Sequence, residues 1–124
     1  MKRLYCVIIL IVLMLSIGCG GTKPKDVNAE IFRYGLAALE TADEYLDGKI
    51  DIATARKQVG NAYDSISLAK NTAGSTSGAD LMVSTNVLLL DTAMLNKELG
   101  NGTTDDILEA RNYLAESLNE KNRK

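Results

Sequence analysis

The sequence predicts an all-α protein, an antiparallel up-down-up-down four-helix bundle over residues 26–124. Apolar residues in this range recur at intervals of three and four, which is the spacing along one face of an α-helix, and strand-like alternation is absent. Four such segments are separated by short stretches that are rich in glycine and polar residues. Because short connections force neighbouring helices to run antiparallel, a bundle is the simplest arrangement that buries all four apolar faces.

The first two predicted helices cover residues 27–47 and 52–70. Asp26 and Asp51 are their expected N-caps, since a carboxylate at that position accepts hydrogen bonds from exposed backbone N–H groups. Gly48 follows the first helix at the place where a left-handed backbone conformation is common. The predicted core stripes are Phe32, Gly35, Leu39, Ala42 and Leu46 in the first helix, and Ile52, Ala55, Val59, Ala62, Ile66 and Ala69 in the second. A second apolar row lies beside the first stripe of the first helix and consists of Val27, Ile31, Tyr34, Ala38 and Tyr45.

The pairing of these two helices predicts which layers of side chains meet. Folding the hairpin about Lys49 places Gly35 opposite Ala62, and these two small residues would let the helix backbones approach closely. The next layer pairs the larger Leu39 and Val59, which fill the space on either side. The closest approach in the hairpin is therefore expected between Gly35 and Ala62.

The third predicted helix covers residues 79–99 and has apolar residues around much of its circumference. It is therefore expected to be the most buried element. Leu88, Leu89 and Leu90 together exceed what one face of a helix can bury. They indicate either a central position in the core, which is the reading we favour, or a contact with another protein.

The fourth predicted helix covers residues 104–119, with Thr103 or Thr104 as its N-cap. The charged tail, residues 119–124, is expected to fray. The inner stripe of this helix consists of Ile107, Ala110, Leu114 and Leu118.

The first 18 residues have the pattern of a secretory signal peptide. Lys2 and Arg3 form a short positive region, and residues 4–17 form an uncharged apolar block. A membrane-spanning helix needs about 20 apolar residues, so this block is short for a span and typical of a signal peptide. An uncleaved signal-anchor helix that extends through Gly21 is the alternative. Either reading places the rest of the chain outside the cytoplasm, because the positive residues stay inside.

The end of this block, "LSIGC" at residues 15–19, resembles the lipobox of bacterial lipoprotein precursors. The resemblance implies that the thiol of Cys19 receives diacylglycerol and that signal peptidase cleaves between Gly18 and Cys19. Ser16 departs from the family pattern, in which leucine is usual three positions before the cysteine.

This resemblance sets the predicted organisation of the chain. Residues 1–18 are the lipoprotein signal peptide, residues 19–25 a lipidated tether, and residues 26–124 the bundle domain. In Gram-negative members of the family, an aspartate directly after the cysteine favours retention at the inner membrane. Gly20 stands there in this chain, so a lipid-anchored envelope protein at the outer membrane is expected if the host has one.

The composition of the mature chain argues against several function classes. Cleavage would remove Cys6 and leave Cys19 as the one cysteine, and the whole sequence has no histidine. Zinc and haem sites would lack their usual ligands, and the commonest general base is missing. Loss of Lys2 and Arg3 moves the net charge from −2 to −4, which disfavours nucleic acid binding. We therefore expect no enzyme, no cofactor and no metal site.

Two acidic patterns are interpreted as structural. Residues 43–54 look like half of an EF-hand calcium loop, but Tyr45 and Thr54 stand where calcium ligands are required. No nucleophile or histidine accompanies the acids of the first helix, so they are expected to form a solvated face. These acids are Glu40, Asp43, Glu44 and Asp47.

Two function hypotheses follow from the sequence. The first is a lipid-anchored, non-catalytic cell-envelope protein that acts by protein interaction or in a structural role. Its partners would be the membrane, through the lipid anchor, and an envelope protein. The alternative is a binder of a small molecule or lipid with a pocket inside the helical bundle. Four tyrosines could line such a groove between helices, namely Tyr34, Tyr45, Tyr63 and Tyr113.

Overall fold

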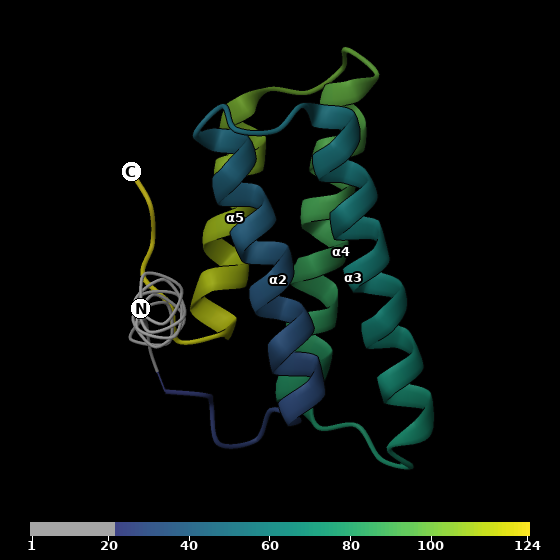
Figure 1. The fold of residues 1–124 in the computed structure, drawn as a ribbon. Coiled ribbons are helices and arrows are strands. Elements are labelled where there is room, and N and C mark those ends of the chain that lie inside the picture. Colours follow the sequence, from purple (N-terminus) through teal and green to yellow (C-terminus); the bar gives the residue numbers. More distant parts are fainter. Residues whose placement is uncertain (1–21) are drawn as a thin grey trace, which may run out of the picture.

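The computed structural model describes residues 22–124, and these residues form an all-helical bundle (Figure 1). Consecutive helices run antiparallel and are joined by residues 47–51, 73–77 and 99–103. The predicted up-down-up-down four-helix bundle is thereby confirmed. The helices are α2 (Ala29–Leu46), α3 (Ile52–Thr72), α4 (Gly78–Glu98) and α5 (Thr104–Ser117).

The helix ends follow from the capping residues. Asn28, and not Asp26, caps α2, because its side-chain oxygen accepts from the first free N–H groups of the helix. The prediction was wrong here because Asp26 lies in a turn that precedes the helix. Asp51 caps α3 as predicted, and Thr103 caps α5 in a reciprocal capping box. Gly48 has a φ of +75°, which confirms its predicted role at the end of α2.

The segment before α2, residues 22–28, is attached to the bundle at both of its ends. The Ser77 hydroxyl donates to the carbonyl of Asp26 at 2.6 Å, and the Asn119 amide donates to the carbonyl of Thr22 at 3.3 Å. Because Ser77 caps α4 and Asn119 follows α5, the described chain begins at the end of the bundle where α4 starts (Figure 1).

One hydrophobic core runs along the bundle axis. The predicted stripes of α3 and α5 are buried, apart from the half-buried Ile52. In α2 the buried side lies between the two predicted rows. Gly35, Leu39 and Ala42 of the first row are buried together with Ile31 and Ala38 of the second, while Phe32 and Leu46 are half-buried. The largest fully buried side chains are Ile31, Ile66, Leu90, Met94, Ile107, Leu114 and Leu118.

Gly35 makes room for a different pair of helices than predicted. A Cβ atom at Gly35 would lie 3.0 Å from a methyl of Val83 in α4 and 3.0 Å from a methyl of Leu118 beyond α5. The close approach therefore involves α4 and the end of α5, and the expected facing of Gly35 and Ala62 is wrong. Because the buried side of α2 lies between the two predicted rows, Gly35 faces the centre of the bundle, where Val83 and Leu118 are its nearest neighbours.

Candidate interaction surfaces

The predicted lipidation and cleavage site, Gly18 and Cys19, lies outside the described residues. The described residues begin at one end of the bundle, and an anchor on Cys19 would be attached at that end. A lipid at Cys19 would be joined through Gly20 and Gly21 to Thr22, which is held by Asn119 at that end.

The outer face of α4 is apolar and open to water. Leu81, Met82, Leu88 and Leu89 are 49%, 57%, 42% and 47% exposed, whereas Leu90 is fully buried. The buried residues of α4 outnumber those of each other described helix. The favoured core position is nevertheless wrong for Leu88 and Leu89, because only Leu90 of the three leucines is buried. A helix in a four-helix bundle buries only the side that faces its neighbours, and α4 has more apolar residues than that side holds.

The length and composition of α4 are also relevant to a membrane. Among the described residues, α4 is the one helix long and apolar enough to cross a bilayer. Its inner face nevertheless belongs to the bundle core, where Val83, Val87, Leu90 and Met94 are fully buried. A core helix of a soluble bundle meets the same criteria, so this finding does not assign α4 to a membrane.

Charged side chains flank this apolar face on both sides. On the α3 side, Arg56 donates to the carboxylate of Glu98 at 3.0 Å. Asp91 lies on the same side, and partial burial, with a smaller contribution from the charge of Asp64, raises its pKa. On the α5 side, the carboxylates of Asp106 and Glu109 border a shallow hollow of about 270 Å³ next to α4. The α3 border therefore carries charges of both signs, and the α5 border carries carboxylates.

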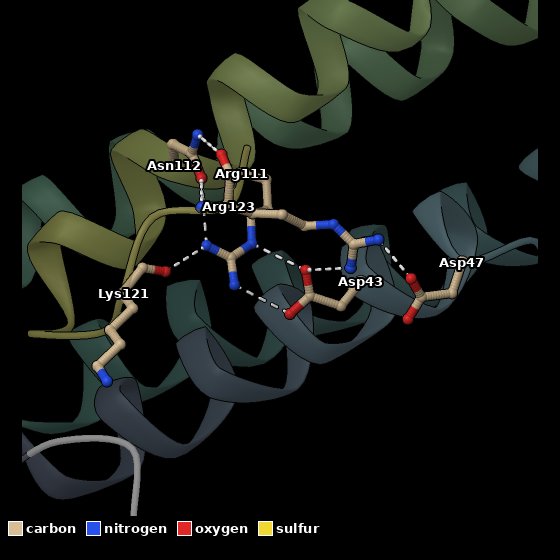
Figure 2. A network of polar contacts seen from close by, with 6 residues as sticks. All are labelled: Asp43, Asp47, Arg111, Asn112, Lys121 and Arg123. Carbon is tan, nitrogen blue, oxygen red and sulfur yellow. Dashed lines mark hydrogen bonds and ion pairs between the residues drawn. The ribbon is translucent and has the colours of Figure 1, made fainter.

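A second surface feature is a polar network between α2 and α5 (Figure 2). The guanidinium of Arg111 donates from Nε and Nη2 to the two carboxylate oxygens of Asp43, at 2.8 and 3.0 Å. Its Nη1 donates to the carbonyl of Lys121 at 2.6 Å. The Arg111 side chain is only 9% exposed and that of Asp43 is 30% exposed. This bidentate geometry is the strong form of an ion pair.

The same network holds the C-terminal tail in place. Asn112 donates to the carbonyl of Arg123 and accepts from its backbone N–H, both at 2.8 Å. The Arg123 guanidinium also contacts the carboxylates of Asp43 and Asp47. The tail therefore does not hang free as expected, and Asp43 and Asp47 belong to ion pairs and not to a purely solvated face.

The Arg123 contact changes the titration of Asp47. The hydrogen bond from the Arg123 guanidinium lowers the pKa of the Asp47 carboxyl from its ordinary value. Since the folded pKa is depressed, this contact adds stability above the ordinary carboxyl pKa of 3.8. That contribution is lost as the pH falls through the lowered value.

In residues 22–124, no three Asp, Glu, His or Cys side chains gather closely enough to hold a metal ion. Among the hollows that these residues form, three have volumes of about 490, 270 and 200 Å³. They contain Tyr63, Tyr113 and Tyr34 respectively, so these three tyrosines line separate hollows.

Comparison with protein families, with curated proteins and with solved structures finds no match to this chain.

Proposed function

We propose that this chain is a lipid-anchored, non-catalytic cell-envelope protein that acts by contact between the outer face of α4 and another protein. The observation that carries the proposal is the row of exposed apolar side chains at Leu81, Met82, Leu88 and Leu89. Water-exposed apolar residues that lie together on one face are typical of protein interaction sites.

The lipid anchor is supported by the sequence. The lipobox-like residues 15–19 precede the described chain by only a few residues. Thr22 lies at the end of the bundle where α4 begins, so Leu81 and Met82 would be at the membrane-proximal end. Gly20 after the cysteine favours the outer membrane in a Gram-negative host.

The proposal of a non-catalytic role rests on composition. The sequence has no histidine, and the predicted mature chain has no thiol other than the lipidated Cys19. The carboxylates of Asp43 and Asp47 form ion pairs with Arg111 and Arg123.

The alternative, a binder with a pocket inside the bundle, has less support. The centre of the described bundle is filled by large side chains, among them Ile66, Leu90 and Met94. The three hollows lie at the surface, mostly between exposed and half-buried residues. A lipid or small molecule would therefore need helices α2–α5 to separate before it could enter the core.

The anchor is tested by Cys19→Ala. We expect this variant to remain at the mass of the full precursor and to incorporate no labelled fatty acid, because the acyl acceptor thiol is absent. Intact mass and fatty-acid labelling in cells measure both. A Cys19→Ala chain that is processed to the same mass as the parent would refute the lipobox interpretation.

The contact surface is tested by a photo-crosslinking amino acid at position 88, in place of the exposed Leu88. Illumination of intact cells is expected to join the chain to a protein, because this side chain lies in the proposed contact. The matched control carries the same amino acid in place of Glu40, which is exposed on α2. Equal adducts from both positions, or none from position 88, would contradict a specific role of α4.

A further inference from the structure

The C-terminal tail, residues 119–124, lies against the bundle without a hydrophobic contact of its own. Its sequence, NEKNRK, has no apolar residue, and Leu118 directly before it is the last residue of the core. All of its residues are exposed or half-buried. Because a polar segment loses conformational freedom when it is fixed on a surface, the position of this tail depends on its hydrogen bonds and ion pairs.

Two side chains of α5 hold the tail by its backbone (Figure 2). Arg111 Nη1 donates to the carbonyl of Lys121 at 2.6 Å. The amide of Asn112 bonds to both the carbonyl and the N–H of Arg123, each at 2.8 Å. These three bonds fix the register of the tail, and a shift by one residue would move Arg123 away from its place at the seam between α2 and α5.

The side chain of Arg123 joins this tail to α2. Its guanidinium forms ion pairs with Asp43 and Asp47, which are one helical turn apart. All three side chains are partly exposed, at 31% for Arg123, 30% for Asp43 and 41% for Asp47. A further contact, from the Asn122 amide to the Glu116 carboxylate at 2.9 Å, is exposed. The attachment to α2 is therefore ionic and within reach of solvent ions.

The helices have a connection of their own that does not require the tail. The bidentate pair of Arg111 and Asp43 joins α5 to α2 directly. The N–H of Glu120 donates to the carbonyl of Ala115 at 2.8 Å, which completes the end of α5 before residue 121. Partly exposed ion pairs and single hydrogen bonds each add little net stability, and they oppose the entropy cost of ordering residues 121–124. Local opening of these residues is therefore accessible while the bundle stays folded.

We propose that residues 121–124 form a salt-sensitive strap across the seam between α2 and α5. The strap is closed when Arg123 pairs with the acids of α2, and a rise in ionic strength favours the open state because salt screens these partly exposed pairs. Opening uncovers the amide of Asn112 and the Nη1 group of Arg111, while the pair of Arg111 and Asp43 keeps the helices together. This inference depends neither on the lipid anchor nor on the α4 face.

The test is limited digestion of the full chain by trypsin in mild detergent, followed by mass spectrometry. Cleavage after Lys121 measures the open strap, and cleavage after Lys57 within α3 measures opening of the bundle, because a protease acts on the locally opened state. Arg123→Ala is compared with Lys124→Ala, which removes the same charge from the neighbouring, exposed residue. Each rate after Lys121 is divided by that of a peptide of residues 115–124 with the same substitution at the same salt concentration.

At low salt, Arg123→Ala is expected to be cleaved after Lys121 roughly five- to tenfold faster than the parent, and Lys124→Ala at the rate of the parent. Raising the salt from about 0.01 M to about 1 M shortens the Debye length from about 30 Å to about 3 Å. This should speed cleavage after Lys121 in the parent and leave Arg123→Ala almost unchanged.

The rate of cleavage after Lys57 should be the same in the parent and in Arg123→Ala. Equal rates after Lys121 in these two proteins, or an equal response of both to salt, would overturn the strap. If Arg123→Ala instead accelerates cleavage after Lys57 as much as after Lys121, the tail unfolds only together with the bundle, and the proposal also fails.

Discussion

Replacing Arg111 with methionine is expected to lower the free energy of unfolding by about 2–3 kcal/mol. The change keeps most of the aliphatic bulk, but removes the two hydrogen bonds to Asp43 and the one to the carbonyl of Lys121. The Asp43 carboxylate, whose side chain is 30% exposed, would lose its closest cation. Urea unfolding of residues 22–124, followed by circular dichroism, measures the difference.

Two further variants separate this ion pair from a general effect of losing an arginine. Arg33→Met removes an exposed arginine that lies over the ring of Tyr34, and should change stability by about 0.5 kcal/mol or less. Adding Asp43→Leu to Arg111→Met should recover part of the loss, because no partly buried carboxylate then remains with only the longer contact to Arg123. If the two arginine variants lose the same stability, the network does not hold α2 and α5 together.

Replacing Gly35 with leucine is expected to destabilise the bundle by about 1–3 kcal/mol. Even a single carbon at this position would lie 3.0 Å from methyl groups of Val83 and Leu118, both of which are fully buried. The larger side chain must push α2 away from α4 or force its neighbours out of their rotamers. A change of 1 kcal/mol shifts the Tm of a domain this small by about 4–8 °C, so a thermal melt detects it.

Gly60 offers a matched control within α3. A Cβ atom there meets only the carboxylate of Asp91, at 3.8 Å, so there is room for a side chain. Gly60→Leu should raise stability by about 0.5–1 kcal/mol, since glycine is a poor helix former. The two substitutions thus have opposite expected signs. Equal melting temperatures for the two variants would show that α2 does not approach α4 at Gly35.

Features that depend on residues close together in the sequence were predictable, whereas contacts between residues far apart in the sequence were not. Asp51, Thr103 and Gly48 act within one turn of their helix, and their roles are as predicted. Arg111 and Asp43 are 68 residues apart, and Asn112 and Arg123 meet only because the tail turns back along α5. The spacing of residues in the sequence does not identify partners that are so far apart. The sequence therefore predicted solvated acids on α2 and a fraying tail.

The candidate contact surface was also only partly visible in the sequence. Leu88, Leu89 and Leu90 are more leucines than one helix face can bury, which indicates either a core position or a contact with another protein. The rotation of α4 about its own axis decides between the two, because it buries Leu90 and leaves Leu88 and Leu89 exposed. This rotation is set by the packing of all four helices together. The sequence does not define it, because apolar residues lie around most of the circumference of α4.

The number and order of the helices, most of their ends and the antiparallel bundle follow from the sequence, because spacing, caps and short loops act locally. The first residues also carry the lipobox pattern on which the proposed location rests. Which side of each helix faces the core follows only from the packed bundle. There Gly35 meets Val83 of α4, Asp43 pairs with Arg111, and Leu81, Leu88 and Leu89 are exposed. Helix rotation is fixed by the simultaneous close packing of all four helices, and no single segment contains that information.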